Sequence, residues 1–132
     1  MRECAGQLNV IDRPRRSVHI RPDDMHASAN LYFANAGGKV IVAPLNVNQD
    51  GICYEQEAVR VLDAGYSLAD LGDALKEALS AFSERPRDLR LHKKTDWPAF
   101  RASGLSSVAR FESEFLPVSV ECLNASGAVA RA

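Results

Sequence analysis

Short apolar runs rich in β-branched residues dominate the first half of the chain and predict strands. They occupy residues 8–11, 17–20, 31–33, 39–45 and 52–54. The run at 39–45 directly follows a turn sequence that contains Gly37 and Gly38, so it predicts a β-hairpin with 31–33. Prolines and charged residues separate the other runs, which favours short strands joined by loops.

The clearest helix signal lies at residues 68–83. Ser67 predicts an N-cap, Asp70 completes a pattern like a capping box, and Pro86 stops the helix. The apolar side chains recur at helical spacing and form one stripe: Leu68, Leu71, Leu75, Ala78, Leu79 and Phe82. The opposite side carries acidic residues: Asp70, Asp73 and Glu77.

Two shorter segments also have helical patterns. Residues 57–65 favour a short helix closed by Gly65, with a strand as the alternative. Residues 96–104 predict one or two helical turns, with Asp96 as the N-cap, Pro98 in the first turn and Gly104 at the end.

The last part of the chain mixes both periodicities. Residues 108–115 fit a helix or a strand, and residues 118–122 predict a strand by composition. The tail from about residue 124 is weakly patterned, and we expect it to be loosely held. This order of elements predicts an α+β fold: a mainly antiparallel sheet with a central amphipathic helix and one or two short helices on one face.

Composition is typical of one soluble globular domain spanning residues 1–132, because 46% of the residues are hydrophobic and 25% are charged. No apolar run reaches the roughly 18 residues of a membrane span. The first 17 residues contain no continuous apolar stretch, so we do not expect a secretory signal peptide. Cys4, Cys53 and Cys122 are widely separated, which predicts reduced thiols and a cytoplasmic location.

Catalytic and metal-binding patterns are absent from the sequence. The histidines and cysteines are scattered singly, without the paired spacing that zinc sites need. Gly37 and Gly38 precede a strand rather than a helix, so they do not form a phosphate loop. Cys53 lies between Asp50 and Glu55, and acidic neighbours disfavour a reactive thiolate. We therefore expect no enzymatic activity, no cofactor and no metal site.

Charge is distributed unevenly, although the formal net charge is −1. Residues 50–84 hold two Lys or Arg against eight Asp or Glu. Clustered carboxylates suit docking to a basic protein such as a nuclease, since complementary fields steer the encounter. The candidate docking residues lie in loops or on the acidic helix face: Asp23, Asp24, Asp50, Glu55, Glu57, Asp70, Asp73 and Glu77. A solvated helix face without a partner is the alternative for the last three.

The basic segment at 85–94 supports a second interpretation, because it holds five Lys or Arg against one Asp. Its cations could contact phosphates, and the aromatic Trp97 and Phe100 that follow could stack on bases. The alternative is a solvated connection with two buried leucines, Leu89 and Leu91.

One segment of the C-terminal third is specific enough to suggest a family. It reads DWPAFRASG at residues 96–104 and continues through SVARF at 107–111 to Phe115 and VSV at 118–120. This segment resembles the immunity proteins of contact-dependent growth inhibition. The order of an early strand, a hairpin and an acidic amphipathic helix is similar as well.

The resemblance implies a small bacterial cytosolic protein that binds and neutralises one cognate toxin domain, often a nuclease, without being an enzyme. It implies that Trp97, Phe100 and Phe111 are core residues, and it carries over no toxin-binding residue. We expect such a protein to block the active or substrate-binding surface of the toxin, with no direct contact to nucleic acid or membrane. The alternative is a small nucleic-acid-binding or regulatory module that uses the basic segment at 85–94.

Overall fold

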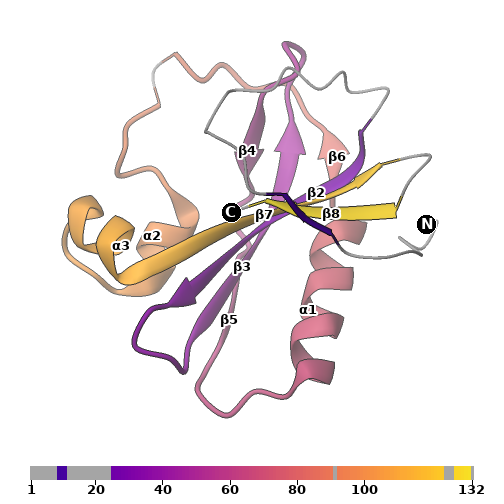
Figure 1. Ribbon diagram of the computed structural model, residues 1–132. Coiled ribbons are helices and arrows are strands. Elements are labelled where there is room, and N and C mark those ends of the chain that lie inside the picture. Colours follow the sequence, from indigo (N-terminus) through magenta and orange to yellow (C-terminus); the bar gives the residue numbers. More distant parts are fainter. Residues whose placement is uncertain (1–8, 12–24, 91, 124–126, 132) are drawn as a thin grey trace.

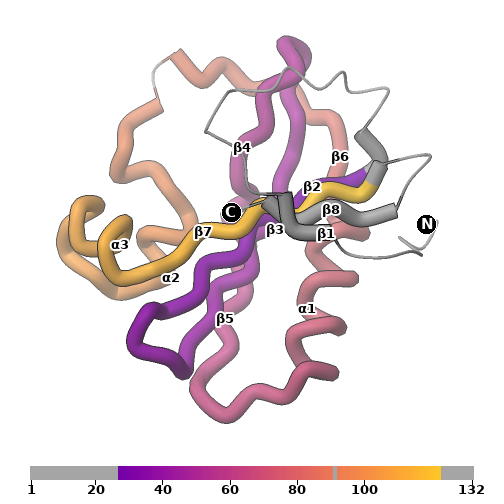
Figure 2. Tube along the Cα trace, viewed as in Figure 1, coloured from indigo at the N-terminus to yellow at the C-terminus, as the bar shows by residue number. Residues whose placement is uncertain are grey.

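The computed structural model describes residues 9–11, 25–90, 92–123 and 127–131 (Figure 1). Figure 2 traces the path of the chain in the same view. The helices of this described part are α1 (Leu68–Ser80), α2 (Pro98–Ser103) and α3 (Val108–Glu114). Its strands are β1 (Asn9–Ile11), β2 (Met25–Ala34), β3 (Val40–Val47), β4 (Cys53–Glu55), β5 (Arg60–Leu62), β6 (Ser83–Glu84), β7 (Phe115–Leu123) and β8 (Gly127–Arg131).

The strands form one mainly antiparallel sheet in the order β1-β8-β7-β2-β3-β4, and β5 and β6 also pair with β3. The long strand β2 lies between β7 and β3, and only the β1–β8 and β3–β6 pairings among the described strands are parallel. This arrangement confirms the α+β class and the predicted hairpin. The hairpin turn contains Gly37 and Gly38 at φ angles of +81° and +98°, which glycine adopts without steric strain.

Two hydrophobic cores lie on opposite faces of the sheet, because successive residues of a strand point to opposite sides. On one face, Leu31 and Val42 pack with Leu79 of α1. On the other face, Ile41 packs with Phe111 of α3 and with residues of α2. Figure 1 shows α1 on one side of the central strands and α2 and α3 on the other. The two short helices thus share one face, and the amphipathic helix covers the opposite one.

Helix α1 begins at the predicted cap. The Ser67 hydroxyl accepts a bond from the amide of Asp70, and the Asp70 carboxylate accepts one from the amide of Ser67, both at 3.0 Å. The helix ends at Ser80 rather than at residue 83, because the next residues turn into β6 and pair with β3. Leu68 was expected to be buried with Leu79, yet its side chain is 85% exposed. The start of α1, at Leu68, therefore lies beyond the apolar surface of the sheet.

The helix favoured for residues 57–65 is wrong, and the alternative, a strand, is confirmed for Arg60–Leu62, which form β5. Val61 pairs with Ile41 and Leu62 with Val40, and this pairing satisfies backbone hydrogen-bonding groups along the edge of β3. Gly65 does not close a helix; it adopts a φ of +92° in the loop before α1. The open edge of β3 decides the structure of this segment, and a local pattern cannot reveal that edge.

Residues 98–114 form the two short helices. Helix α2 begins after Trp97 rather than at Asp96, whose carboxylate instead accepts a bond from the amide of Lys93 at 3.1 Å. Gly104 ends α2 at a φ of +76°, as its position predicts. Its left-handed backbone gives the chain the turn that it needs to reach α3.

The segment with mixed periodicity contains both structures. Residues 108–114 are helical and the strand β7 begins at Phe115, so each pattern describes part of the segment. β7 also includes the strand predicted at 118–122. The tail from residue 124, which we expected to be loosely held, includes β8, whose backbone pairs with β7.

Three further expectations concern the early chain and the cysteines. The strand predicted at 17–20 lies outside the described residues, whereas β1 confirms the strand predicted at 8–11. Cys122 is disulfide-bonded, which corrects the expectation of three reduced thiols, and Cys53 keeps its thiol. Within the described ranges, no helix is both long and apolar enough to cross a membrane.

Candidate interaction surface

Within the described part of the chain, the predicted docking carboxylates do not gather on one surface. Asp23 and Asp24 lie outside the described residues. Asp70 lies at the start of α1, on one side of the sheet, and its carboxylate caps that helix. Glu57 points to the opposite side and forms an ion pair with Arg101 of α2 at 2.6 Å. The cluster expected from the sequence is therefore divided between two faces of the molecule.

The remaining surface carboxylates are exposed and have few partners. Glu77 forms an ion pair with Arg60 of β5 at 3.0 Å, and its side chain stays 75% exposed. Asp50 lies in the β3–β4 turn, and Asp73 lies on the outer face of α1; both are exposed. An isolated exposed ion pair contributes little to stability, so these residues remain available to solvent or to a partner.

Glu55 is buried, and this corrects its assignment as a docking residue. Only 8% of its surface is exposed, so its carboxylate cannot meet another protein. One carboxylate oxygen accepts bonds from the Trp97 indole at 3.1 Å, the Asn30 amide at 3.1 Å and the Tyr32 hydroxyl. The other accepts the backbone amide of Ala99 at 3.0 Å. A buried carboxylate needs such donors because it has lost its water.

The Tyr32 hydroxyl lies at the centre of this network. It donates to Glu55 and accepts a bond from the Trp97 indole at 3.2 Å. Burial raises the pKa of Tyr32 above its ordinary value of 10.0, and the negative charge of Glu55 raises it further. Ser119 of β7 extends the network by donating to the Asn30 side chain at 3.1 Å. The network thereby ties α2 to β2, β4 and β7 and has a structural role.

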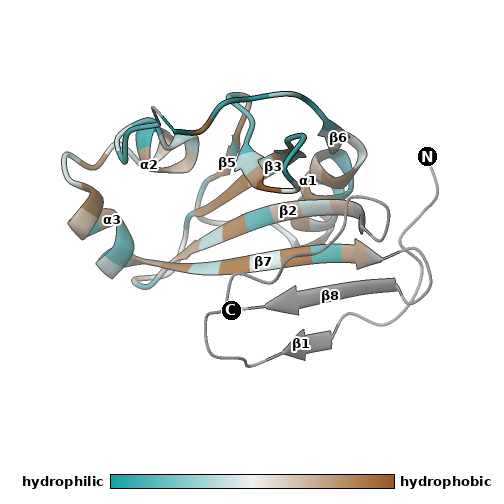
Figure 3. Ribbon diagram, turned by 90° about the horizontal axis from the view of Figure 1, so that it is seen from above, coloured by the Kyte–Doolittle hydropathy of each residue, from teal (hydrophilic) through white to brown (hydrophobic). Residues whose placement is uncertain are grey.

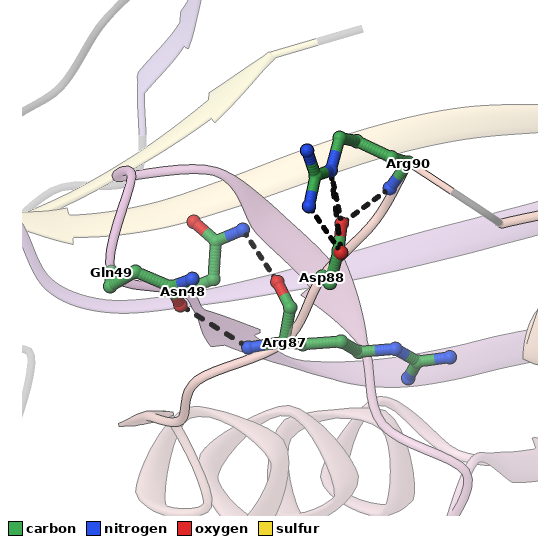
Figure 4. A network of polar contacts seen from close by, with 5 residues as sticks. All are labelled: Asn48, Gln49, Arg87, Asp88 and Arg90. Carbon is green, nitrogen blue, oxygen red and sulfur yellow. Dashed lines mark hydrogen bonds and ion pairs between the residues drawn. The ribbon is translucent and has the colours of Figure 1, made fainter.

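The basic segment that follows β6 is held against the β3–β4 hairpin by its own backbone. The Arg85 amide donates to the Val47 carbonyl at 2.9 Å, and the Tyr54 hydroxyl donates to the Arg85 carbonyl at 3.1 Å. Two residues later, the Arg87 carbonyl accepts a bond from the Asn48 side chain at 3.1 Å. The Arg87 amide donates to the Gln49 side chain at 3.3 Å (Figure 4).

Asn48 organises the hairpin turn as well as the basic segment. Its side-chain oxygen accepts bonds from the amides of Asp50 at 2.9 Å and Ile52 at 3.0 Å, while its amide group reaches Arg87. Only 1% of Asn48 is exposed. Sequence reasoning missed this residue, although an Asn two residues before Asp50-Gly51 is a turn signal with a known mechanism.

The cations of the segment differ in their partners. Arg90 makes paired hydrogen bonds to Asp88, and these bonds lower the pKa of that carboxyl group (Figure 4). The guanidinium of Arg87 lies 5.0 Å from the centre of the Tyr54 ring, within cation–π distance. Arg85 has no ion pair within the described part of the chain and is exposed.

These residues define one surface, which we call the arginine ridge: Arg85, Arg87 and Arg90 with the neighbouring Ile52 and Tyr54. Ile52 contributes apolar area, since 47% of its surface is exposed. Figure 3 shows the hydrophilic segment between β6 and α2 lying along the edge of the molecule beyond β3. The ridge differs from the acidic residues because hydrogen bonds hold its elements together.

Metal binding has no support among the described residues, where no group of three His, Cys, Asp or Glu side chains is placed to hold an ion. Comparison of the chain with protein-family models, curated proteins and solved structures gives no match.

Proposed function

We propose that this chain is an immunity protein of the contact-dependent growth inhibition type, which binds one cognate toxin domain and blocks its active or substrate-binding surface. One observation carries the proposal beyond the sequence resemblance. The segment that bears the resemblance forms a single aromatic cluster in which Phe111 contacts Trp97 at 4.8 Å and Phe100 at 6.0 Å between ring centres. The resemblance implies this packing, because it treats the three aromatics as core residues.

The aromatic cluster also extends into the sheet. Phe111 lies 5.3 Å from Tyr32 of β2 and 5.0 Å from Phe115 of β7, measured between ring centres. Such pairs contribute roughly 0.5–1.5 kcal/mol each beyond the burial of their area. This packing fixes α2 and α3 on the sheet and leaves the charged segments at the surface for a partner.

The proposed mechanism is steric and electrostatic exclusion of the toxin's substrate. A complex of this kind buries roughly 1,200–2,000 Å² in total and depends on a few anchor residues. Charged surfaces speed the encounter, so we expect the association rate to fall as the salt concentration rises. An association rate that does not change between low and high salt would contradict this electrostatic part.

The test is co-expression with the toxin domain encoded by the neighbouring gene. We expect the two proteins to co-purify and the cells to survive only when both are present. A toxin domain from an unrelated system serves as the control, and this chain should neither bind it nor protect against it. Growth arrest despite co-expression of the neighbouring toxin would overturn the proposal.

The proposal places the protein in the cytoplasm, where an incoming toxin is met. Fractionation of the cells into cytoplasm and periplasm, followed by immunoblotting, tests the location. Recovery of the protein in the cytoplasmic fraction supports the proposal, and recovery in the periplasmic fraction contradicts it.

A further inference from the structure

We propose that the arginine ridge is the surface that docks the toxin, and that it binds an acidic patch on it. This inference rests on the proposed function and deepens it by naming the surface and the charge of its partner. It reverses the expectation from the sequence, in which carboxylates of this chain meet a basic surface. Three structural observations favour the ridge.

The first observation is that the ridge is ordered before a partner arrives. The backbone of Arg85 and Arg87 makes four hydrogen bonds to the β3–β4 hairpin: two through Arg85 and two through Arg87. Holding a loop in its bound conformation reduces the ordering entropy that binding must overcome. Among the exposed acidic residues within the described ranges, Glu57 and Glu77 are each held instead by one ion pair to an arginine.

The second observation concerns charge. Arg85 and Arg87 have no carboxylate partner within the described part of the chain, whereas Arg60, Arg101 and Arg110 each form an ion pair. An uncompensated guanidinium presents a planar fork of donors that matches a carboxylate. The geometry therefore suits a partner that brings Asp or Glu side chains to this surface.

The third observation is the mixture of residue types, which favours a protein over a nucleic acid. Arg, Tyr and an exposed apolar residue are typical of the centre of protein interfaces, and Ile52 supplies the apolar part. Asp50 and Asp88 lie beside the ridge and interrupt its positive charge, so a continuous row of phosphates fits it poorly. The Tyr54 ring already contacts Arg87, so it is not an open platform for a base.

The experiment compares two charge reversals of equal size. The test variant carries Arg85→Glu and Arg87→Glu; the matched control carries Lys76→Glu on α1 and Arg110→Glu on α3, which are exposed and lie outside the ridge. Both changes alter the net charge by the same amount. Association with the toxin domain is measured by stopped-flow fluorescence at low and high salt. Circular dichroism and thermal unfolding confirm that both variants fold, and Arg85→Ala with Arg87→Ala replaces the test variant if it does not.

We expect the Arg85 and Arg87 reversal to slow association at low salt by about tenfold or more, and the control to change it by less than about threefold. The salt dependence of the rate should fall only in the test variant. If the wild-type protein binds the toxin and the test variant binds equally well, the ridge proposal is overturned while the proposed function stands. If the wild-type protein does not bind the toxin, the proposed function itself fails.

A third arm tests the other class of partner. The wild-type protein and both variants are titrated with a fluorescent single-stranded RNA of about 20 nucleotides at physiological salt, a length that covers one or two typical binding sites. We expect no binding that depends on Arg85 and Arg87. Tight RNA binding that only the test variant loses would assign the ridge to nucleic acid and overturn the protein partner.

Discussion

The indole Nε1 of Trp97 donates a hydrogen bond to the buried carboxylate of Glu55 at 3.1 Å. The bond joins the residue before α2 to the last residue of β4, across 42 positions of the sequence. The Ala99 amide, in the first turn of α2, donates to the same carboxylate at 3.0 Å. Glu55 thus accepts hydrogen bonds from the beginning of α2, and the position of that helix depends on this one side chain.

Replacing Glu55 with alanine should destabilise the protein by about 2–4 kcal/mol, because it leaves several buried donors without an acceptor. The free energy of unfolding, measured by urea denaturation, checks this. Glu57→Ala is the control, since it removes an exposed ion pair with Arg101 and should change stability by less than about 1 kcal/mol. Equal effects of the two substitutions would show that the network around Glu55 does not hold α2.

The raised pKa of Tyr32 predicts a loss of stability at high pH. The folded protein keeps this hydroxyl protonated above pH 10, where an unfolded chain releases the proton, so the folded state becomes less favoured as the pH rises. The additional fall approaches about 1.4 kcal/mol per pH unit. Urea denaturation between pH 8.5 and about 11 should show a steeper decline in the wild-type protein than in Tyr32→Phe. Parallel declines would contradict the prediction.

Cys53 should react slowly with thiol reagents. Burial raises its pKa to about 11, and the charge of Glu121 adds to this shift, so the reactive thiolate is scarce at pH 8. We expect alkylation to be roughly 100-fold slower than for an exposed cysteine. The labelled peptide is identified by mass spectrometry, and Ile52→Cys in a Cys53→Ser background provides the exposed comparison. Comparable rates at positions 52 and 53 would refute the burial argument.

Asn48→Asp should loosen the arginine ridge while preserving the hairpin turn. The remaining side-chain oxygen can still accept the amides of Asp50 and Ile52, but the donor to the Arg87 carbonyl is lost. Hydrogen exchange of the peptide covering residues 85–90 should accelerate by about tenfold. Gln49→Ala removes only the 3.3 Å bond from the Arg87 amide and should cause a smaller change.

Two leucines of α1 should respond very differently to alanine. Leu79 is 5% exposed, and its truncation should destabilise the protein by about 2–4 kcal/mol. Leu68 is 85% exposed, and its truncation should change stability by less than about 0.5 kcal/mol. Thermal or urea unfolding separates the two cases, and a large loss at Leu68 would place that residue in the core.

Local signals predicted much of this fold. The capping box of Ser67 and Asp70 and the glycine turn at Gly37-Gly38 depend on neighbours a few residues away, and the structure confirms both. Residues 57–65 were misjudged because the partner of β5 is β3, which no local pattern reveals. Leu68 was placed in the core because helical spacing shows which side chains share one face of the helix. It does not show how far the sheet extends beneath that helix.

The candidate surface was harder to predict than the fold. Nothing in the local sequence distinguishes Glu55 from its acidic neighbours. Its burial depends on Trp97 and Ala99, which lie far away along the chain. The basic segment was recognised from its charge. The attachment of this segment through Asn48 was not recognised, because a single Asn can equally well form hydrogen bonds only within its own turn.

The pairing of β2 with β7 affects how the protein is made. Ala29 pairs with Val120, so the central strand β2 can pair with β7 only after the intervening residues 30–119 have been synthesised. A nascent chain that has emerged as far as α2 holds the β2–β3 hairpin with one edge of β2 still open. Folding must then wait for a contact between distant parts of the sequence, which is slow and exposes the open edge to other chains. A chaperone that covers this edge of β2 during synthesis would prevent its pairing with other chains.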